Sequence, residues 1–150
     1  MTGEGDFENV KLKNIMSNYK LFTDGGARGN PGPAGIGGVL YNFQDQKIVD
    51  FSVYLGEATN NQAEYKALLK GLELALEHKV KNLDCYLDSE LVVKQLKREY
   101  KVKNKDLASL FVKAWNLSLK FKKITFHHIT RDKNTVADAL ANQAMDKAAS

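Results

Sequence analysis

The chain has 150 residues, of which 43% are apolar and 27% charged, a composition typical of an ordinary globular protein. No apolar run approaches the roughly 18 residues that a membrane-spanning helix needs, and the first residues lack the pattern of a secretory signal. We therefore expect a cytoplasmic protein with no membrane partner. The single cysteine, Cys85, excludes an internal disulfide bond and a zinc site built from several thiolates, and its apolar neighbours predict a buried, unreactive thiol.

Residues 1–17 are polar and show no periodicity, so we expect a flexible tail, followed by one folded domain over residues 18–150. The domain opens with three strand-like runs, at 19–24, 35–42 and 47–57. A glycine- and proline-rich segment, 25–35, is expected to form a loop between the first two strands. The short connections predict antiparallel neighbours.

Helices and strands alternate in the rest of the chain. Thr59 and Asn60 are candidate caps of a helix that runs to about His78, because apolar residues recur there at helical spacing. We expect a strand at 82–89, helices at 89–97 and 105–121, a strand at 124–129 and a helix at about 134–148. Trp115 lies four residues after Phe111, a spacing that predicts a place in the helix core. The order of elements indicates an α/β fold, with a mixed sheet covered by helices.

Four acidic residues occupy positions where a carboxylate costs energy. Glu64 and Asp138 lie near the starts of two expected helices, at spacings that place them on or beside the apolar faces. Asp24 and Asp88 end two strand runs, where ligands gather in α/β sheets. Taken singly, each acid could be a helix cap, a turn residue or a partner of a lysine. The four together favour a shared site.

A shared site would need cations, because two carboxylates about 5 Å apart repel by about 3 kcal/mol at an effective dielectric near 20. Oxygen ligands without any Cys/His zinc spacing select hard ions, so we expect Mg²⁺, with Mn²⁺ as a substitute. Two such ions would suit phosphodiester hydrolysis, one activating water and the other stabilising the leaving oxygen. A net charge of +4 suits such a polyanionic substrate without requiring one.

The chain resembles the type 1 ribonuclease H family in four segments: TDGGARGNPGPAGIGGVL, ATNNQAEYKALLKGLELAL, LDSELVVKQLKREYKVKN and TRDKNTVADALANQA. They occur in the family's order and cover about residues 19–147. The resemblance implies a ribonuclease H-like fold, a five-stranded mixed sheet with three antiparallel strands and then two parallel ones, flanked by helices. It also implies endonucleolytic cutting of the RNA strand of RNA/DNA hybrids, leaving 5′-phosphate and 3′-hydroxyl ends.

The resemblance also implies the roles of the four acids. Matched residue by residue, Asp24, Glu64, Asp88 and Asp138 fall on the family's metal-binding carboxylates, which hold two Mg²⁺ ions around the scissile phosphate.

The resemblance assigns substrate contacts to a group of amides. It places Asn30, Asn60 and Asn61 in the minor groove of the hybrid, with Gln62 nearby. Amide side chains can bond both ribose 2′-hydroxyls and base edges, which lets a protein distinguish RNA from DNA. Local turn and cap hydrogen bonds are the alternative for these residues.

A fifth catalytic group has two candidates. Many family members carry a mobile histidine before the last helix, and His128 lies ten residues before Asp138 at a comparable spacing. His128 falls inside an expected strand, however, which is a poor mobile arm. Other members place an arginine seven residues before the last acid, here Arg131. We prefer Arg131, because a fixed cation could stabilise developing charge without carrying a proton. A structural histidine and a surface arginine remain the alternative.

The grip on the substrate differs from that of some family members, because the basic, tryptophan-rich insertion after the third acid is missing here. Lys97, Arg98 and Lys101 belong to a basic cluster at 94–105 and could contact the hybrid in its place. A solvated helix face is the alternative. Fewer phosphate contacts predict weaker, salt-sensitive binding.

Two other functions compete with this interpretation. One is a nuclease of the same broad fold that acts on DNA, against which the TNNQ and RGNPGP segments argue. The other is a non-catalytic module that binds hybrids or double-stranded RNA, which would not need four mutually repelling acids. We expect a monomer.

Overall fold

A five-stranded mixed sheet forms the centre of the computed structural model, which describes residues 18–150. The tail predicted for residues 1–17 lies outside the described residues. The strand order is β3-β2-β1-β4-β5, with β1 paired antiparallel to β2, β2 antiparallel to β3, and β4 parallel to both β1 and β5. The strands are β1 (Asn18–Ala27), β2 (Gly32–Tyr41), β3 (Lys47–Ala58), β4 (Asn82–Leu87) and β5 (Lys123–His128). The predicted sheet is confirmed.

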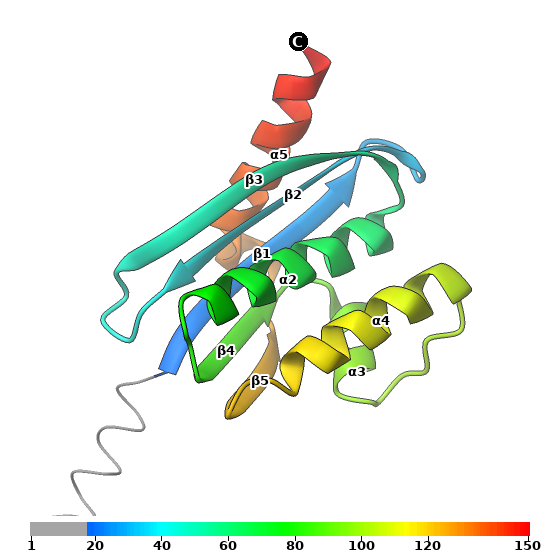
Figure 1. Cartoon of the computed structure of the whole chain (residues 1–150). Helices are drawn as coiled ribbons and strands as arrows, with labels where there is room; N and C mark the ends of the chain where they lie inside the picture. The colour runs from blue at the N-terminus through cyan, green and yellow to red at the C-terminus, as the bar shows by residue number, and fades with distance from the viewer. Residues whose placement is uncertain (1–17) are drawn as a thin grey trace, which may run out of the picture.

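Helices cover both faces of the sheet (Figure 1). On one face lie α2 (Asn60–Glu77), α3 (Glu90–Leu96) and α4 (Lys105–Ser118), and on the other lies α5 (Thr135–Ala149), which packs on β1, β2 and β3. A short 3₁₀ turn, η1 (Arg131–Lys133), precedes α5. Among the described residues, no helix is long and apolar enough to cross a membrane.

The larger core fills the space between the sheet and α2, α3 and α4. Leu21, Cys85 and Phe126 are aligned across β1, β4 and β5, and they pack with Leu68 and Leu72 of α2. Cys85 is fully buried, as predicted, and burial raises the pKa of its thiol well above the usual value. A thiol that stays protonated is a poor nucleophile.

Two glycines let helices approach the sheet closely. A Cβ atom on Gly25 would lie 2.2 Å from the Ala63 carbonyl oxygen, at the start of α2. A Cβ on Gly37 would lie 2.5 Å from the Ala141 backbone nitrogen, on α5. Because larger residues would push both helices away, these glycines set the positions of the acids that α2 and α5 carry.

The structure corrects three details of the predicted elements. The segment 25–35 is largely strand, since β1 continues to Ala27 and β2 begins at Gly32, which leaves only a tight turn. Trp115 is half-buried and stacks on Phe111, with ring centroids 6.0 Å apart, so it is not a core residue. His128 is the exposed last residue of β5 and not an interior strand residue. Amphipathic spacing identified the α4 helix but not how deeply each position is buried.

Candidate active site

Three carboxylates meet at one edge of the sheet. Asp24 belongs to β1, Glu64 to the start of α2, and Asp88 follows β4 directly. One oxygen of each lies within 4.8 Å of the others. The sheet explains this convergence, because Thr23 of β1 is paired with Leu87 of the parallel strand β4. The residue after each of them is an aspartate, so Asp24 and Asp88 lie side by side. The close approach at Gly25 brings in Glu64.

Burial and mutual repulsion make the charged state of this cluster costly. Burial, together with the charges of Asp88 and Asp138, raises the pKa of Asp24 to about 7. Burial and the neighbouring Asp24 also raise the pKa of Glu64 well above its usual value, although the Gly25 backbone amide opposes this shift. Only 6% of Asp24 and 7% of Glu64 is exposed, so water screens the repulsion poorly.

The cluster has the properties of a cation site. The Glu64 Oε2 atom is buried without a hydrogen-bond partner among the described residues, and a cation would satisfy it and remove the repulsion described above. The donors are all carboxylate oxygens, which suits a hard ion such as Mg²⁺ or Mn²⁺. The site therefore fits the predicted divalent ions, and Asp24, Glu64 and Asp88 are the residues that could hold them.

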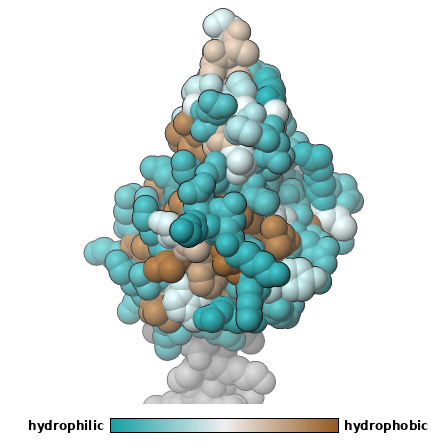
Figure 2. Space-filling view, turned by 90° about the vertical axis from the view of Figure 1, so that its right-hand side faces the viewer, coloured by the Kyte–Doolittle hydropathy of each residue, from teal (hydrophilic) through white to brown (hydrophobic). Residues whose placement is uncertain are grey.

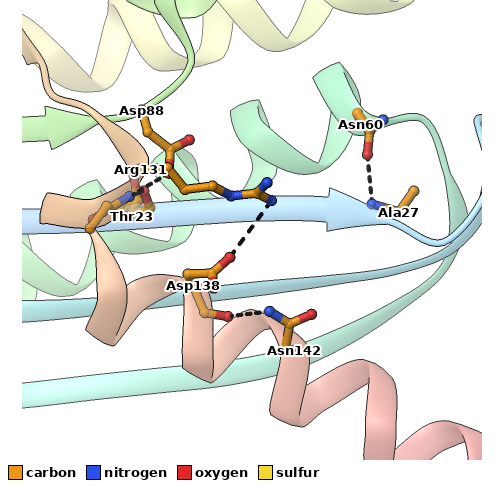
Figure 3. A network of polar contacts seen from close by, with 8 residues as sticks. Thr23, Ala27, Asn60, Asp88, Arg131, Asp138 and Asn142 are labelled. Carbon is orange, nitrogen blue, oxygen red and sulfur yellow. Dashed lines mark hydrogen bonds and ion pairs between the residues drawn. The ribbon is translucent and has the colours of Figure 1, made fainter.

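The fourth predicted acid lies beside this trio. Asp138, in the first turn of α5, affects the pKa of Asp24 through a side-chain hydrogen bond and its charge. Its side chain is one-third exposed, and one oxygen lies 3.9 Å from the Arg131 guanidinium group. Figure 3 shows Arg131 reaching toward Asp138. Asp138 thus lies at the more open side of the cluster.

Arg131 and His128 have different neighbours. Arg131 is mostly exposed and approaches the acids through Asp138. His128, at the end of β5, affects the pKa of Glu90 on α3, outside the acidic cluster. The structure therefore places Arg131 against Asp138, and it places His128 opposite Leu87 at the end of β5.

Three of the predicted amides lie at the start of α2, near Glu64, and Asn30 of the β1–β2 turn is bonded to one of them. The Asn30 side-chain oxygen accepts from the Asn60 backbone amide at 3.0 Å, and the Asn60 side-chain oxygen accepts from the Ala27 amide at 2.8 Å. Figure 3 shows Asn60 turned toward Ala27. Gln62 closes a capping box with Thr59, where it accepts from the Thr59 amide at 2.9 Å. The side-chain oxygens of these three residues thus make the local turn and cap hydrogen bonds that were the alternative to substrate contacts.

The nitrogens of two of these amides are differently placed. Among residues 18–150, the NH₂ groups of Asn30 and Asn60 donate no hydrogen bond, because only their side-chain oxygens are engaged. Asn61 is half-buried between Asn60 and Gln62. The same side chains can therefore hold the loop to the helix and still donate to a ligand.

The comparisons with known proteins show the family of this chain. Residues 22–144 match the family model described as Reverse transcriptase-like, which is more than half of the chain. Ribonuclease H of Hydrogenovibrio crunogenus is 34% identical over 151 residues, covering 88% of this chain and 98% of that protein. The chain belongs to the type 1 ribonuclease H family.

Other relatives of this ribonuclease H domain are longer or have been solved with nucleic acid. Bifunctional protein Rv2228c of Mycobacterium tuberculosis is 44% identical over 127 residues, which are 84% of this chain but only 35% of that protein. The chain thus spans about a third of the length of this relative. The structure of LC11-RNase H1 in complex with an RNA/DNA hybrid superposes with a TM-score of 0.83 at 43% identity, covering 88% of this chain and 99% of the other.

The predicted basic contacts of the ribonuclease H domain lie where α3 leads into α4. Lys97, Arg98 and Lys101 are all exposed there. Figure 2, which views the side to the right in Figure 1, shows hydrophilic residues around a group of apolar ones. The Arg98 guanidinium group lies 5.5 Å from the centre of the Trp115 ring and 5.8 Å from that of Phe111. Stacking on two rings holds a cation in place while leaving its donors free.

The sequence analysis missed one residue of the site, Asn134. It stands directly before α5 and is 1% exposed, and its side-chain nitrogen donates to the Asp88 carboxylate at 3.2 Å. An asparagine at that position predicts a helix cap, and only the fold shows that its side chain turns inward.

Proposed function

We propose that this ribonuclease H domain cleaves the RNA strand of RNA/DNA hybrids, leaving 5′-phosphate and 3′-hydroxyl ends. The observation that carries the proposal is the convergence of Asp24, Glu64 and Asp88, with oxygens within 4.8 Å of one another. A related domain, LC11-RNase H1, has been solved with an RNA/DNA hybrid, which supports the same substrate here.

The four acids would hold two Mg²⁺ ions, or Mn²⁺ in their place. When bound, such ions lower the pKa of coordinated water and stabilise negative charge on the phosphate oxygens. Asp24 and Glu64 contribute buried oxygens to this site, whereas Asp138 contributes a partly exposed one. Asp138 is therefore the acid best placed to contact ions or water that enter with the substrate.

Recognition of the RNA strand would fall to the amides beside Glu64. Asn30 and Asn60 tie the β1–β2 turn to the start of α2 through their oxygens. Their NH₂ groups, with Asn61 and Gln62, could donate to 2′-hydroxyls and base edges in the minor groove. Fixing the amides in this way lowers the entropy lost when the hybrid binds.

Arg131 is our candidate for the fifth group at the reaction centre. It lies 3.9 Å from Asp138 and is 83% exposed, so it can turn toward a phosphate without losing a strong ion pair. A guanidinium group stays charged at any physiological pH and would stabilise negative charge on the reacting phosphate. His128 is paired with Leu87 of β4, and among residues 18–150 it forms no ion pair with the four acids.

The α3–α4 connection would contact phosphates of the hybrid farther from the reaction centre. Arg98 and Lys101 line a groove of about 470 Å³ together with Tyr100 and Phe111. The seven-residue helix α3 begins two residues after Asp88 and carries Gln95, which also lines the groove, so the groove lies roughly 10 Å from the site at about 1.5 Å per residue. With one phosphate of a strand about every 3.4 Å along the helix axis, Lys97, Arg98 and Lys101 would lie a few nucleotides from the scissile bond.

A cleavage assay on matched duplexes tests the proposal. The purified protein would be incubated with labelled RNA/DNA, RNA/RNA and DNA/DNA duplexes in Mg²⁺ and, separately, in Mn²⁺. We expect cutting of the RNA strand of the hybrid only, and its loss in Asp24→Asn and Asp138→Asn variants that remain folded. Cutting of the DNA duplex would favour the DNA-acting alternative, and hybrid binding without any cleavage would favour the binding module.

A further inference from the structure

Asn134 joins the three chain segments that carry Asp24, Asp88 and Asp138. Its side-chain nitrogen donates to the Thr23 carbonyl oxygen at 2.9 Å and to the Asp88 Oδ2 atom at 3.2 Å. Its backbone carbonyl accepts from the Asp138 amide at 3.1 Å. Thr23 directly precedes Asp24. Asn134 is therefore bonded to the neighbour of Asp24, to the side chain of Asp88 and to the backbone of Asp138.

The chemistry of these contacts requires an amide nitrogen. Both side-chain partners, a carbonyl oxygen and a carboxylate oxygen, can only accept, so the atom between them must be a donor with two hydrogens. Asparagine provides such a group on a short side chain, whereas aspartate and leucine of similar size have none. A donor to a carboxylate makes one of the stronger hydrogen bonds in proteins.

The orientation of Asn134 is not that of an ordinary helix cap. Asparagine before a helix commonly accepts from a backbone amide of the first turn, but Asn134 makes no side-chain cap bond to α5. Its side-chain oxygen is buried without a partner among the described residues, which is itself unfavourable. A residue that served only the helix would turn its oxygen toward α5. The contacts instead favour a role toward Asp88.

We infer that Asn134 is a positioning residue that fixes the Asp88 carboxylate for cation binding. The bond to Oδ2 occupies one oxygen and leaves the other available, while the bond to the Thr23 carbonyl holds β1 and the start of α5 together. This inference rests on the proposed function, because it assumes that Asp88 is a metal ligand. Groups that orient metal ligands typically contribute 10- to 100-fold to metal affinity.

The test compares the binding of Mn²⁺ and Mg²⁺ by calorimetry, without nucleic acid, in Asn134→Ala and Asn134→Asp. Asparagine-to-aspartate keeps the size but removes the donor. Asn142→Ala is the matched control, because Asn142 lies on the same helix and donates at 3.0 Å to the backbone carbonyl of Asp138 but to no carboxylate. We expect metal affinity to fall by about 10- to 100-fold in Asn134→Ala and to stay within about twofold in Asn142→Ala.

A second readout separates positioning from simple destabilisation. The Mg²⁺ concentration for half-maximal hybrid cleavage should rise in Asn134→Ala, with the KM for hybrid at saturating Mg²⁺ unchanged and the circular dichroism spectrum intact. Unaltered metal affinity in either folded Asn134 variant would overturn the inference, as would a wild-type protein that binds neither ion. A wild-type protein that binds the ions but does not cut the hybrid would overturn the proposed function, while the calorimetric comparison would still decide the role of Asn134.

Discussion

The Asn30 side-chain oxygen accepts a hydrogen bond from the Asn60 backbone amide at 3.0 Å. This bond joins the turn between β1 and β2 to the first residue of α2, four residues before Glu64. The amides expected to recognise RNA are therefore bonded to the same helix start that carries Glu64, an acid proposed to bind metal. On the proposed function, substrate recognition and metal binding would share one local structure.

Two substitutions at Asn30 should separate its two roles. Asn30→Asp keeps the acceptor for Asn60 but replaces the NH₂ group, so we expect an almost unchanged melting temperature and a higher KM for the hybrid. Asn30→Ala removes both groups and should also lower the free energy of unfolding by about 0.5–1.5 kcal/mol. Thermal melts and cleavage kinetics measure these changes. Equal KM values for Asn30→Asp and the wild type would remove the proposed substrate contact.

The stability of the metal-free protein should fall as the pH rises. The pKa of Asp24 is about 7 in the folded protein, against about 4 for an unfolded aspartate. Between these values the folded protein binds more protons than the unfolded chain, so the free energy of unfolding decreases with increasing pH. Glu64 shifts in the same direction. Melting temperatures measured in a chelator from pH 5 to pH 8 should decline, and Asp24→Asn should flatten the decline.

Added Mg²⁺ provides the control for that experiment. At pH 8 the ion should raise the melting temperature of the wild type, because it binds the folded carboxylates. Asp24→Asn should respond much less. A wild-type protein whose stability without metal rises from pH 5 to pH 8 would contradict the electrostatic account of the cluster.

Arg131→Ala should lower kcat more than His128→Ala does. Removing one electrostatic stabiliser of a transition state commonly costs about 10²- to 10³-fold in kcat when it touches the reacting group. Arg131 is mostly exposed, so we expect a loss of about 10-fold or more. His128 forms no ion pair with the four acids among residues 18–150, so its replacement should cost little. Single-turnover cleavage at saturating Mg²⁺ measures both. The opposite order would assign the helper role to His128.

Arg98→Ala should weaken hybrid binding and reduce its dependence on salt. If the Arg98 guanidinium group contacts one phosphate, the slope of log K against log salt should become less negative by about 0.9. Lys123→Ala is a suitable control, because Lys123 begins β5 at the end of the parallel strands away from Asp88. Binding measured by anisotropy at several salt concentrations tests this, with an inactivating Ca²⁺ buffer to prevent cutting. Equal slopes for Arg98→Ala and the wild type would exclude the contact.

Adjacent glycines in β1 should respond differently to alanine. The Cβ of Gly25→Ala would lie 2.2 Å from the Ala63 carbonyl oxygen, whereas that of Gly26→Ala has its nearest neighbour at 4.0 Å. We expect Gly25→Ala to lower the free energy of unfolding by about 1–3 kcal/mol, as in overpacked cores. It should also displace Glu64, because α2 would move away from β1. Gly26→Ala should change it far less. Denaturant unfolding of the two variants makes the comparison.

The sequence by itself determined the order of the elements, the mixed sheet and the four acids. Periodic apolar residues identified the helices and strands, and acids at strand ends and on inward helix faces indicated a cation site before any family was considered. The helices, the strands and the positions of the acids within them are local features, because each depends on residues within a few turns of one another.

The tertiary structure decided which of these residues meet. Sequence spacing cannot show that Thr23 and Leu87 are paired, that the charge of His128 acts on Glu90, or that Asn134 turns away from its own helix toward Asp88. These relationships join segments that are far apart in the sequence. The bond from Asn134 to the Thr23 carbonyl spans 111 residues. Only the packing of α5 and β4 against β1 brings such groups together, so only the folded chain shows that Asn134 is bonded to Asp88 and to the Thr23 carbonyl.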